Sequence, residues 1–385
     1  MSKKIFISCG EYSGEIHASN LIKELKLSNN DYQIKAFGSC LIKELGVELL
    51  ENYSNYSFSG ITEVLRNLAK IFDLKDRLCK MILEFNPDII ILVDYGGFHT
   101  QLAKSLKQEG FHGKIVQFIA PQIWASRPWR IKNIKKYIDK VYCTLPFEEK
   151  LYYRNAIDVH YVGNPVFSSL SQRKNKKDLG LELSETVIGV FPGSRTAEIQ
   201  YMLPIMIESA KRLKELMPKK KFRFILAKAP NLKIEVLNKY GFDKQSDIEL
   251  FQENLINPNH AFLSAANGLW LCSGTVTLEA AFYATPYFLS YKSTWLNYTL
   301  YRLLRTIKKA GLANIISGKD LVKEFIQHEA NTENFIEETS SWFSGDGYSD
   351  YYKMMQQALQ DFSQTFAKYP SYKLVSDEIA KDLKL

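Results

Sequence analysis

Short runs of consecutive apolar residues, each ending at a corner of small residues, constrain the fold of this chain most. Examples are IFISCG, DIIILVDYGG, VIGVFPG and GLWLCSG, which begin at residues 5, 88, 187 and 268. Apolar residues follow one another in these runs instead of alternating with polar ones, which is typical of parallel strands covered on both faces. Helical segments such as Glu15–Leu27 separate most of the runs. This alternation predicts an α/β fold with doubly wound parallel sheets.

One break in the alternation predicts two domains. Residues 168–186 are polar, basic and poor in apolar side chains, which is typical of a linker. We therefore predict one domain over 1–167 and a second, similar one over 187–345, followed by a helical tail over 346–385. A ligand is expected in the cleft between such domains, at the carboxyl ends of the strands.

Composition excludes several classes of protein. The 385 residues are 46% hydrophobic and 24% charged, as in a soluble globular protein. The sequence has no apolar run long enough to span a membrane, and its first apolar segment is too short for a signal peptide. The five cysteines and six histidines are dispersed, so we predict reduced thiols, no metal and no cofactor. A net charge of +8 is compatible with three kinds of partner: phosphate-bearing small molecules, nucleic acid and an anionic membrane surface.

The corner after the first strand is CGEYSGEI, residues 9–16. Gly10 and Gly14 permit a tight turn with close backbone approach, and a helix start attracts anions. Glu11 and Glu15 place negative charge there, however, and this disfavours a phosphate. The corner also lacks the G-x-G-x-x-G pattern of nicotinamide-cofactor folds. An ordinary loop with a capping acid explains these residues equally well.

A second corner, VFPGSRTAEI, starts at residue 190, shortly after the beginning of the second domain. Pro192 and Gly193 break the strand, and Ser194 can cap the helix that follows. Arg195 stands at the first turn of that helix, where a guanidinium can grip a diphosphate bidentately. The alternative is a surface arginine on a strand–helix loop.

A third corner, CSGTVTLE, begins at residue 272. Ser273, Gly274 and Thr275 offer backbone and hydroxyl donors at a helix start, and Glu279 one turn later can accept hydrogen bonds from a ribose diol. The alternative is a capped helix whose glutamate faces solvent. Together with the second corner, this one could bind a nucleotide diphosphate without a metal.

The strand-like run DIIILVD ends at Asp94. Tyr95 follows, and after it come two glycines. A carboxylate at the end of a strand is expected at the rim of the cleft, where it can act as a general base. The alternative is an aspartate that caps the helix near His99. We interpret His99 itself as a helix-start residue and not as a catalytic one.

Eight motifs resemble, in order, those of the lipid-A-disaccharide synthase family. They are GEYSGE, VDYGGFHTQLAK, PQIWASRPWRIKNIKKYIDK, LPFEEKLY, VGNPV, FPGSRTAEIQYMLPIM, CSGTVTLEAA and LANIISGKDLVKEFIQ, over roughly residues 4–330. Each motif is weak alone, but the ordered set is specific. The resemblance implies a GT-B fold, in which two Rossmann-like domains face each other across a cleft. It implies an inverting glycosyltransferase that joins UDP-2,3-diacylglucosamine to 2,3-diacylglucosamine 1-phosphate, giving UDP and the lipid A disaccharide 1-phosphate.

The resemblance also implies roles for the corner residues. Asp94 would deprotonate the acceptor 6-hydroxyl, and Asp94, Glu11 and Arg195 would form the catalytic set. Glu11, Ser13 and Gly14 would lie on the acceptor side. The residues that would bind the UDP-sugar are Ser194, Arg195, Ser273, Gly274, Thr275, Glu279, Asn314 and Gln327.

Some positions depart from the common family pattern. Gly96 stands where proline is frequent and His99 where asparagine is frequent, so we expect a looser loop after Asp94. The other departures are Ala313 for proline, Asn164 for histidine and Glu15 for aspartate.

Acylated substrates imply that the protein reaches a membrane surface without crossing it. In Glu63–Phe85 apolar residues recur at helical spacing, and basic residues occupy the other positions, as in an interfacial helix. Without the resemblance, a helix that faces the core is the commoner interpretation of this pattern. Trp295–Lys309 is a second candidate, because aromatic residues stand beside bases. We expect a cytoplasmic protein, peripheral on the inner face of the inner membrane, that binds no nucleic acid. A homodimer stays open beside a monomer.

Two other functions remain open. A UDP-sugar 2-epimerase on the same fold would use the same nucleotide corners but need no lipid-contacting helix. A non-catalytic UDP-sugar-binding or lipid-binding protein would keep Arg195 and Glu279 but tolerate the loss of Asp94. By analogy with the GT-B fold, the last helix is expected to cross back to the first domain.

Overall fold

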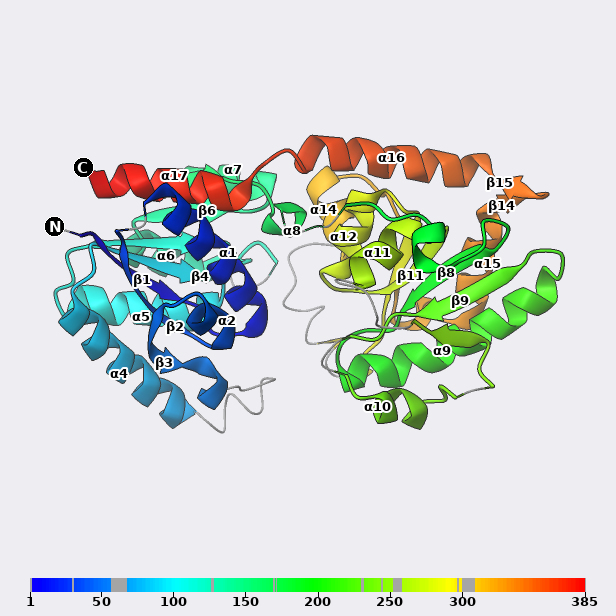
Figure 1. Ribbon diagram of the computed structural model, residues 1–385, viewed down its shortest axis with the longest axis horizontal. Helices are drawn as coiled ribbons and strands as arrows, with labels where there is room; N and C mark the ends of the chain where they lie inside the picture. The colour runs from blue at the N-terminus through cyan, green and yellow to red at the C-terminus, as the bar shows by residue number, and fades with distance from the viewer. Residues whose placement is uncertain are drawn as a thin grey trace. The chain divides into compact units, whose positions relative to one another are not determined.

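The computed structural model describes residues 2–29, 31–56, 68–125, 128–168, 170, 172–229, 232–243, 245–251, 258–295, 298–299 and 309–384. These described residues form two compact units, one from 1–168 with 369–385 and the other from 169–368 (Figure 1). Each unit is built around its own parallel sheet with helices on both faces. The predicted α/β class with doubly wound parallel sheets is therefore confirmed.

Unit 1 has, among its described residues, a seven-stranded sheet in the order β3-β2-β1-β4-β5-β6-β7. The order reverses between β1 and β4, so the carboxyl ends of these two strands form the topological switch point, where ligands bind in such sheets. The strands are β1 (Lys4–Ser8), β2 (Gln33–Gly38), β3 (Glu48–Asn52), β4 (Ile89–Val93), β5 (Lys114–Phe118), β6 (Lys140–Cys143) and β7 (Val159–Tyr161).

The helices of unit 1 follow the strands in the chain and cover both faces of the sheet (Figure 1). They are α1 (Tyr12–Ser28), α2 (Cys40–Glu44), η1 (Tyr53–Tyr56), α4 (Leu68–Phe85), α5 (Gly96–Gln108), η2 (Pro128–Arg130), α6 (Ile131–Tyr137), α7 (Pro146–Arg154), α8 (Pro165–Ser168) and, from the end of the chain, α17 (Ser371–Lys384).

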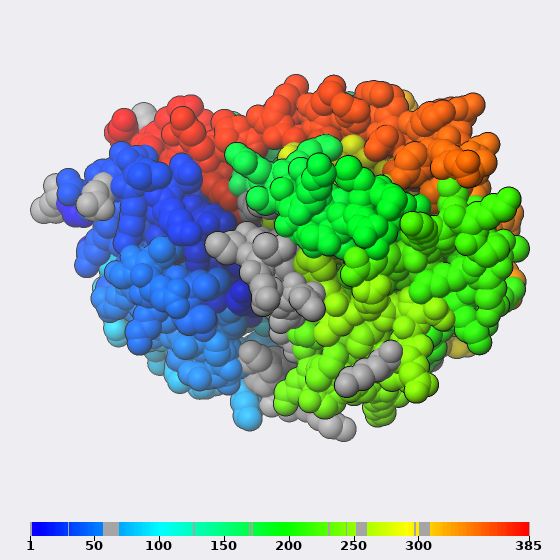
Figure 2. Space-filling view, turned by 45° about the vertical axis from the view of Figure 1, so that its right-hand side comes forward, coloured from blue at the N-terminus to red at the C-terminus, as the bar shows by residue number. Residues whose placement is uncertain are grey.

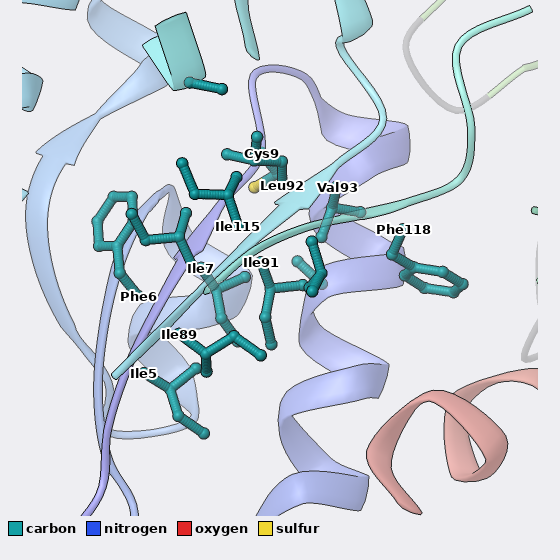
Figure 3. Packing of buried hydrophobic residues seen from close by; sticks show 14 of the residues in the cluster. Ile5, Phe6, Ile7, Cys9, Ile89, Ile91, Leu92, Val93, Ile115 and Phe118 are labelled. Carbon is teal, nitrogen blue, oxygen red and sulfur yellow. The ribbon is translucent and has the colours of Figure 1, made fainter. Parts of the chain in front are cut away.

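The core of unit 1 lies along β1 and β4, whose apolar side chains are buried on both faces of the sheet (Figure 3). All five residues of β4 are buried, and Ile5 and Ile7 of β1 pack beside them. Burying one such side chain contributes about 1.5–3 kcal/mol. The continuous apolar runs therefore fix the strands, and the strands fix the corners at their ends.

Unit 2 has, among its described residues, a six-stranded sheet in the order β10-β9-β8-β11-β12-β13. Its order reverses between β8 and β11, so the second and third sequence corners both lie at its switch point. The strands are β8 (Thr186–Phe191), β9 (Phe222–Leu226), β10 (Ile248–Leu250), β11 (Gly268–Cys272), β12 (Tyr287–Tyr291) and β13 (Glu324–Ile326), with a small hairpin of β14 (Phe343–Ser344) and β15 (Gly347–Tyr348).

Helices also cover both faces of the sheet of unit 2. They are η3 (Lys177–Leu179), α9 (Thr196–Leu216), α10 (Ile234–Lys239), α11 (Pro258–Ala265), α12 (Val276–Tyr283), α14 (Leu312–Ser317), η4 (Gln327–Glu329), α15 (Thr332–Ser341) and α16 (Asp350–Phe366).

The polar stretch 172–185, within the predicted linker, lies on the surface of unit 2 (bright green in Figure 2). The amide of Lys174 donates to the Ser264 hydroxyl at 2.9 Å, and that hydroxyl donates back to the Lys174 carbonyl at 3.2 Å. The tail divides between the units, because α16 packs on α12 in unit 2 and α17 packs on α1 in unit 1.

The two segments predicted to reach a membrane are described only in part, since residues 63–67, 296–297 and 300–308 lie outside the described residues. In α4, Leu74, Leu78 and Ile82 are buried in the core, whereas Phe72 is 53% exposed. Trp295 is 73% exposed. Among the helices that the structure describes, none has the length and hydropathy required to cross a bilayer.

Asp382 of α17 forms ion pairs with lysines at the starts of β5 and β6. Its carboxylate lies 2.8 Å from Lys114 Nζ and 3.1 Å from Lys140 Nζ, and only 8% of the Asp382 side chain is exposed. Burial raises the pKa of Asp382, but the hydrogen bonds and charges of the two lysines outweigh it, so its pKa lies below the usual value.

We predict that Asp382→Asn lowers the free energy of unfolding by about 1–3 kcal/mol at pH 7, because both lysines then face a neutral amide. A carboxyl with a lowered folded-state pKa stabilises the fold above its unfolded pKa, and this stabilisation is lost as the pH falls through the folded pKa. The difference from the parent should therefore shrink below about pH 4 in urea titrations. The exposed Asp377→Asn on the same helix is the control and should change stability little; an equal loss in both variants would contradict the prediction.

Candidate active site

Asp94 follows β4 directly and lies at the switch point of unit 1. Asp94 and Tyr95 both have left-handed backbone conformations, with φ of 52° and 48°, and each costs about 1 kcal/mol or more in a residue other than glycine. The Asp94 amide still donates to the Phe118 carbonyl of β5 at 2.9 Å. The cap position of α5 is Tyr95, without a side-chain hydrogen bond, so the alternative interpretation of Asp94 as the helix cap is wrong. The strained turn instead sets the direction of the Asp94 side chain.

The surroundings of Asp94 shift its acidity toward neutral pH. Burial raises the pKa of Asp94, and the negative charge of Glu11 raises it further, to about 6. Glu11 is exposed and accepts a hydrogen bond from Ser13 Oγ at 3.1 Å. A Cβ added at Gly14 would lie 4.0 Å from Asp94 Cβ, so the helix start closely approaches the acid. Unit 1 thus brings Asp94, Glu11, Ser13 and Gly14 together.

Glu15 has a different role from the one expected at this corner. It is fully buried, and its Oε1 accepts from the Ser39 amide at 2.7 Å while its Oε2 accepts from the Tyr53 hydroxyl at 2.6 Å. The interpretation that Glu15 adds negative charge to the corner is therefore wrong, because its carboxylate is turned toward the start of α2.

In unit 2 the second and third corners open onto one cavity of about 250 Å³. Among the described residues, no hydrogen-bond partner occupies the amides of Gly274, Thr275 and Val276 at the start of α12. Converging amides at a helix start are suited to bind a phosphate. Of the residues predicted to bind the UDP-sugar, those that line the cavity are Ser194, Ser273, Gly274, Thr275 and Glu279.

Arg195 lies at the mouth of this corner and is engaged by Glu198. The Arg195 side chain is 79% exposed, and its Nη1 donates to Glu198 Oε1 at 3.0 Å. Glu198 Oε2 accepts from the amides of Ser194 at 2.9 Å and Arg195 at 3.2 Å. The buried Glu198 therefore already occupies the backbone amides of this corner. The sequence carried a signal for Glu198, a glutamate three residues after the cap position.

Glu279 faces inward. Its side chain is 19% exposed, so the alternative of a solvent-facing glutamate is wrong, and burial raises its pKa to about 7. His260 Nε2 of α11 lies 3.9 Å from Glu279 Oε2, and burial lowers the pKa of this histidine. The sequence gave no signal for His260, because it comes from another helix.

Asn314 and Gln327 are not brought to this cavity. The buried Asn314 amide donates to the Glu324 carboxylate at 2.8 Å and accepts from the Leu321 amide at 2.8 Å. Gln327 has a left-handed backbone with φ of 59°, and its side chain both accepts from the Ser293 amide at 2.8 Å and donates to the Ser293 carbonyl at 3.2 Å. Both residues hold loops beside β13 in place.

The two units therefore carry different chemistry. Unit 1 offers a carboxylate that can accept a proton near neutral pH, and unit 2 offers amide donors for a phosphate with a buried acceptor nearby. In the described part of the chain, no group of three or more His, Cys, Asp or Glu side chains is arranged to hold a metal ion.

Comparisons of the sequence with a family model and with known proteins agree on one family. A family model described as lipid-A-disaccharide synthetase matches residues 5–375. The chain is 32% identical to lipid-A-disaccharide synthase of Trichlorobacter lovleyi over 340 residues, which are 87% of each protein. It is 34% identical to lipid-A-disaccharide synthase 1 of Legionella pneumophila strain Lens over 339 residues, 86% of this chain and 85% of that protein.

Similar solved structures support the fold. The UDP-GlcNAc 2-epimerase of Neisseria meningitidis bound to UDP-GlcNAc has a TM-score of 0.66 at 12% identity, over 99% of this chain and 100% of that one. MurG of Acinetobacter baumannii has a TM-score of 0.60 at 12% identity, with coverage of 99% and 100%. At this identity the likeness concerns the fold alone.

We predict that Glu279→Gln raises the free energy of unfolding by about 1–2 kcal/mol at pH 8. The folded-state pKa of Glu279 lies near 7, above that of the unfolded chain, so its ionised form is disfavoured by folding. This cost is present above pH 7 and vanishes below the unfolded pKa, so parent and variant should melt alike near pH 4 in calorimetry. Glu208→Gln on the exposed face of α9 is the control; a Glu279→Gln protein less stable at pH 8 would refute the prediction.

Proposed function

The chain belongs to the lipid-A-disaccharide synthetase family, and from this membership we propose how its residues perform the transfer. It is a UDP-sugar-dependent glycosyltransferase of lipid A biosynthesis. In the proposed reaction UDP-2,3-diacylglucosamine is the donor and 2,3-diacylglucosamine 1-phosphate the acceptor, with the lipid A disaccharide 1-phosphate and UDP as products. The observation that carries this proposal is the shared cavity of the two corners in unit 2, which is lined by residues expected to bind the donor.

In the proposed donor site, the diphosphate lies at the start of α12. The amides of Gly274, Thr275 and Val276 would donate to its oxygens, and the exposed Arg195 guanidinium would leave Glu198 to contact it from the side. Glu279 would accept hydrogen bonds from the ribose hydroxyls. These groups favour the negative charge that grows on UDP as it leaves, which is electrostatic stabilisation of the transition state.

Asp94 would act as the general base. The acceptor 6-hydroxyl attacks the anomeric carbon of the donor as the bond to UDP breaks, and its proton passes to the Asp94 carboxylate. One displacement inverts the anomeric centre through a transition state that resembles an oxocarbenium ion. A pKa of about 6 makes Asp94 a stronger base than an ordinary carboxylate and still leaves it ionised at neutral pH. Glu11, Ser13 and Gly14 would contact the acceptor.

The epimerase function has less support, although epimerases share the fold. Their likeness to this chain is at 12% identity, whereas the sequence relatives at 32% and 34% are lipid-A-disaccharide synthases. A non-catalytic binding protein would not require a strained turn that holds a carboxylate of raised pKa at the switch point.

We also propose that the protein binds the inner face of the inner membrane as a peripheral protein, through Glu63–Phe85 and Trp295–Lys309. The exposed aromatic side chains of Phe72 and Trp295 support this proposal, because both lie in segments with basic residues. Binding to vesicles with and without anionic lipid tests it. A homodimer stays open beside a monomer.

We predict that Asp94→Asn lowers kcat by about 10²–10⁴-fold, the usual contribution of a general base, and leaves the affinity for UDP unchanged. Turnover is measured as disaccharide phosphate by mass spectrometry, and UDP binding by calorimetry. Asp31→Asn, a surface change before β2, is the matched control. Full activity of Asp94→Asn would remove Asp94 as the base.

We predict that Arg195→Ala weakens UDP binding by about 10–100-fold, since a charge-assisted contact to the diphosphate is lost. Arg195→Lys should restore part of the affinity, because it keeps the charge without the bidentate geometry. The control is Arg212→Ala, which removes an exposed arginine within α9 and should leave UDP binding like that of the parent. Equal affinities of all variants in calorimetry would reject the assignment of Arg195.

A further inference from the structure

The carbonyl oxygen of Asp94, and not only its carboxylate, is held by other side chains. His99 Nδ1 lies 2.7 Å from this oxygen, and Gln117 Nε2 lies 3.0 Å from it. Both side chains are fully buried, His99 on α5 and Gln117 on β5. They restrain the peptide group between Asp94 and Tyr95, the two successive residues with left-handed backbones.

The hydrogen-bond roles of His99 follow from its partners. A carbonyl oxygen only accepts, so Nδ1 of His99 carries the proton and donates to Asp94. Burial lowers the pKa of His99 to about 4, so the ring is neutral at working pH and its Nε2 is an acceptor. The Ser8 hydroxyl, 2.8 Å away, therefore donates to Nε2. A chain of hydrogen bonds runs from the end of β1 through the ring to the turn after β4.

Gln117 joins two strained corners. Its Nε2 also lies 3.3 Å from the carbonyl oxygen of Ile119, which directly follows β5 and has a left-handed backbone with φ of 63°. Its Oε1 is buried without a hydrogen-bond partner among the described residues. An unsatisfied buried acceptor is unfavourable for folding, and this argues against a purely structural origin for the glutamine.

We propose that His99 and Gln117 are positioning residues that hold the left-handed turn and so fix the direction in which the Asp94 carboxylate points. This inference rests on the proposed role of Asp94 as the base. His99 lies in the first turn of α5, as expected, and the proposal adds a positioning role to that place. The turn after Asp94 is held by two hydrogen bonds and is not the looser loop that was expected. A turn with two left-handed residues in succession relaxes readily unless its surroundings fix it.

The test compares four variants with the parent. His99→Leu removes the donor to Asp94. His99→Asn keeps a donor, because Nδ2 of asparagine is as many bonds from the backbone as Nδ1 of histidine. Gln117→Met removes the other donor together with the unsatisfied Oε1, so it should fold well. Ser8→Ala removes the partner of Nε2 and leaves the contact with Asp94.

We expect kcat to fall by about 10–100-fold in His99→Leu and in Gln117→Met, because a displaced base reacts poorly, while KM for each substrate stays within about twofold. His99→Asn should recover most of the loss. Ser8→Ala should lower the melting temperature and keep kcat close to that of the parent. Melting curves and UDP binding show whether each variant is folded.

The pH profile adds a measurement that a structural role would not change. Among the described residues, the charged side chain that acts on Asp94 is Glu11 before α1, and the adjacent Tyr95 contributes its backbone amide. Arg130 of η2 contacts the start of α5, where its Nη2 would lie 3.5 Å from a Cβ at Gly97. His99 is neutral above about pH 4 and does not titrate in the working range. A relaxed turn hydrates Asp94, so the acidic limb of kcat/KM should move from about pH 6 to lower pH in His99→Leu.

A His99→Leu protein with lower stability but parental kcat and an unmoved acidic limb would overturn the positioning role, as would a Gln117→Met protein with parental kcat. Neither result would affect the assignment of Asp94, which depends on Asp94→Asn alone. Conversely, an active Asp94→Asn protein would refute the proposed base whatever the His99 variants do.

Discussion

In each unit the position of the active corners depends on one constraint: a parallel sheet whose strand order reverses in its middle. Adjacent strands at the reversal send their loops to opposite faces, so the ends of both strands stay open to a ligand. The pairs are β1 with β4 and β8 with β11. All residues of β4 and β11 are buried, so the corners that follow them start from fixed backbones. The acid of unit 1 and the amide donors at the start of α12 in unit 2 are local additions to this frame.

Much of this frame can be predicted from the sequence because its signals are local. A strand buried on both faces is a continuous apolar run, and the corner after it consists of glycine, serine or proline next to a helix start. Asp94, Ser194 and Gly274 each follow such a run within a few positions. For this reason the fold class could be predicted, together with some of the residues that line the cavity of unit 2, which are Ser194, Ser273, Gly274, Thr275 and Glu279.

The corner motifs do not predict the hydrogen-bond partners of several polar side chains, because other segments of the chain supply those partners. Glu15 accepts from Tyr53, Asn314 is hydrogen-bonded to Glu324 and to the Leu321 amide, and Gln327 is hydrogen-bonded to the Ser293 backbone. The His99 ring is hydrogen-bonded to Ser8, which lies 91 positions earlier in the chain. A motif gives the type of residue at a corner, but the direction of its side chain depends on which donors the fold brings to it.

Hydrogen-bond saturation separates the structural carboxylates from those proposed to meet substrate. Burial raises the pKa of Glu148 to about 7, yet its carboxylate accepts from Trp124 Nε1 and from two backbone amides at the start of α7. A raised pKa alone therefore does not mark a functional acid. Among the described residues, the adjacent Tyr95 amide is the only hydrogen-bond donor to the Asp94 carboxylate, and no described donor lies within hydrogen-bond distance of the Glu279 carboxylate. Buried acceptors left in this state are unfavourable until a ligand supplies donors, and hydroxyl groups of a sugar and a ribose supply them.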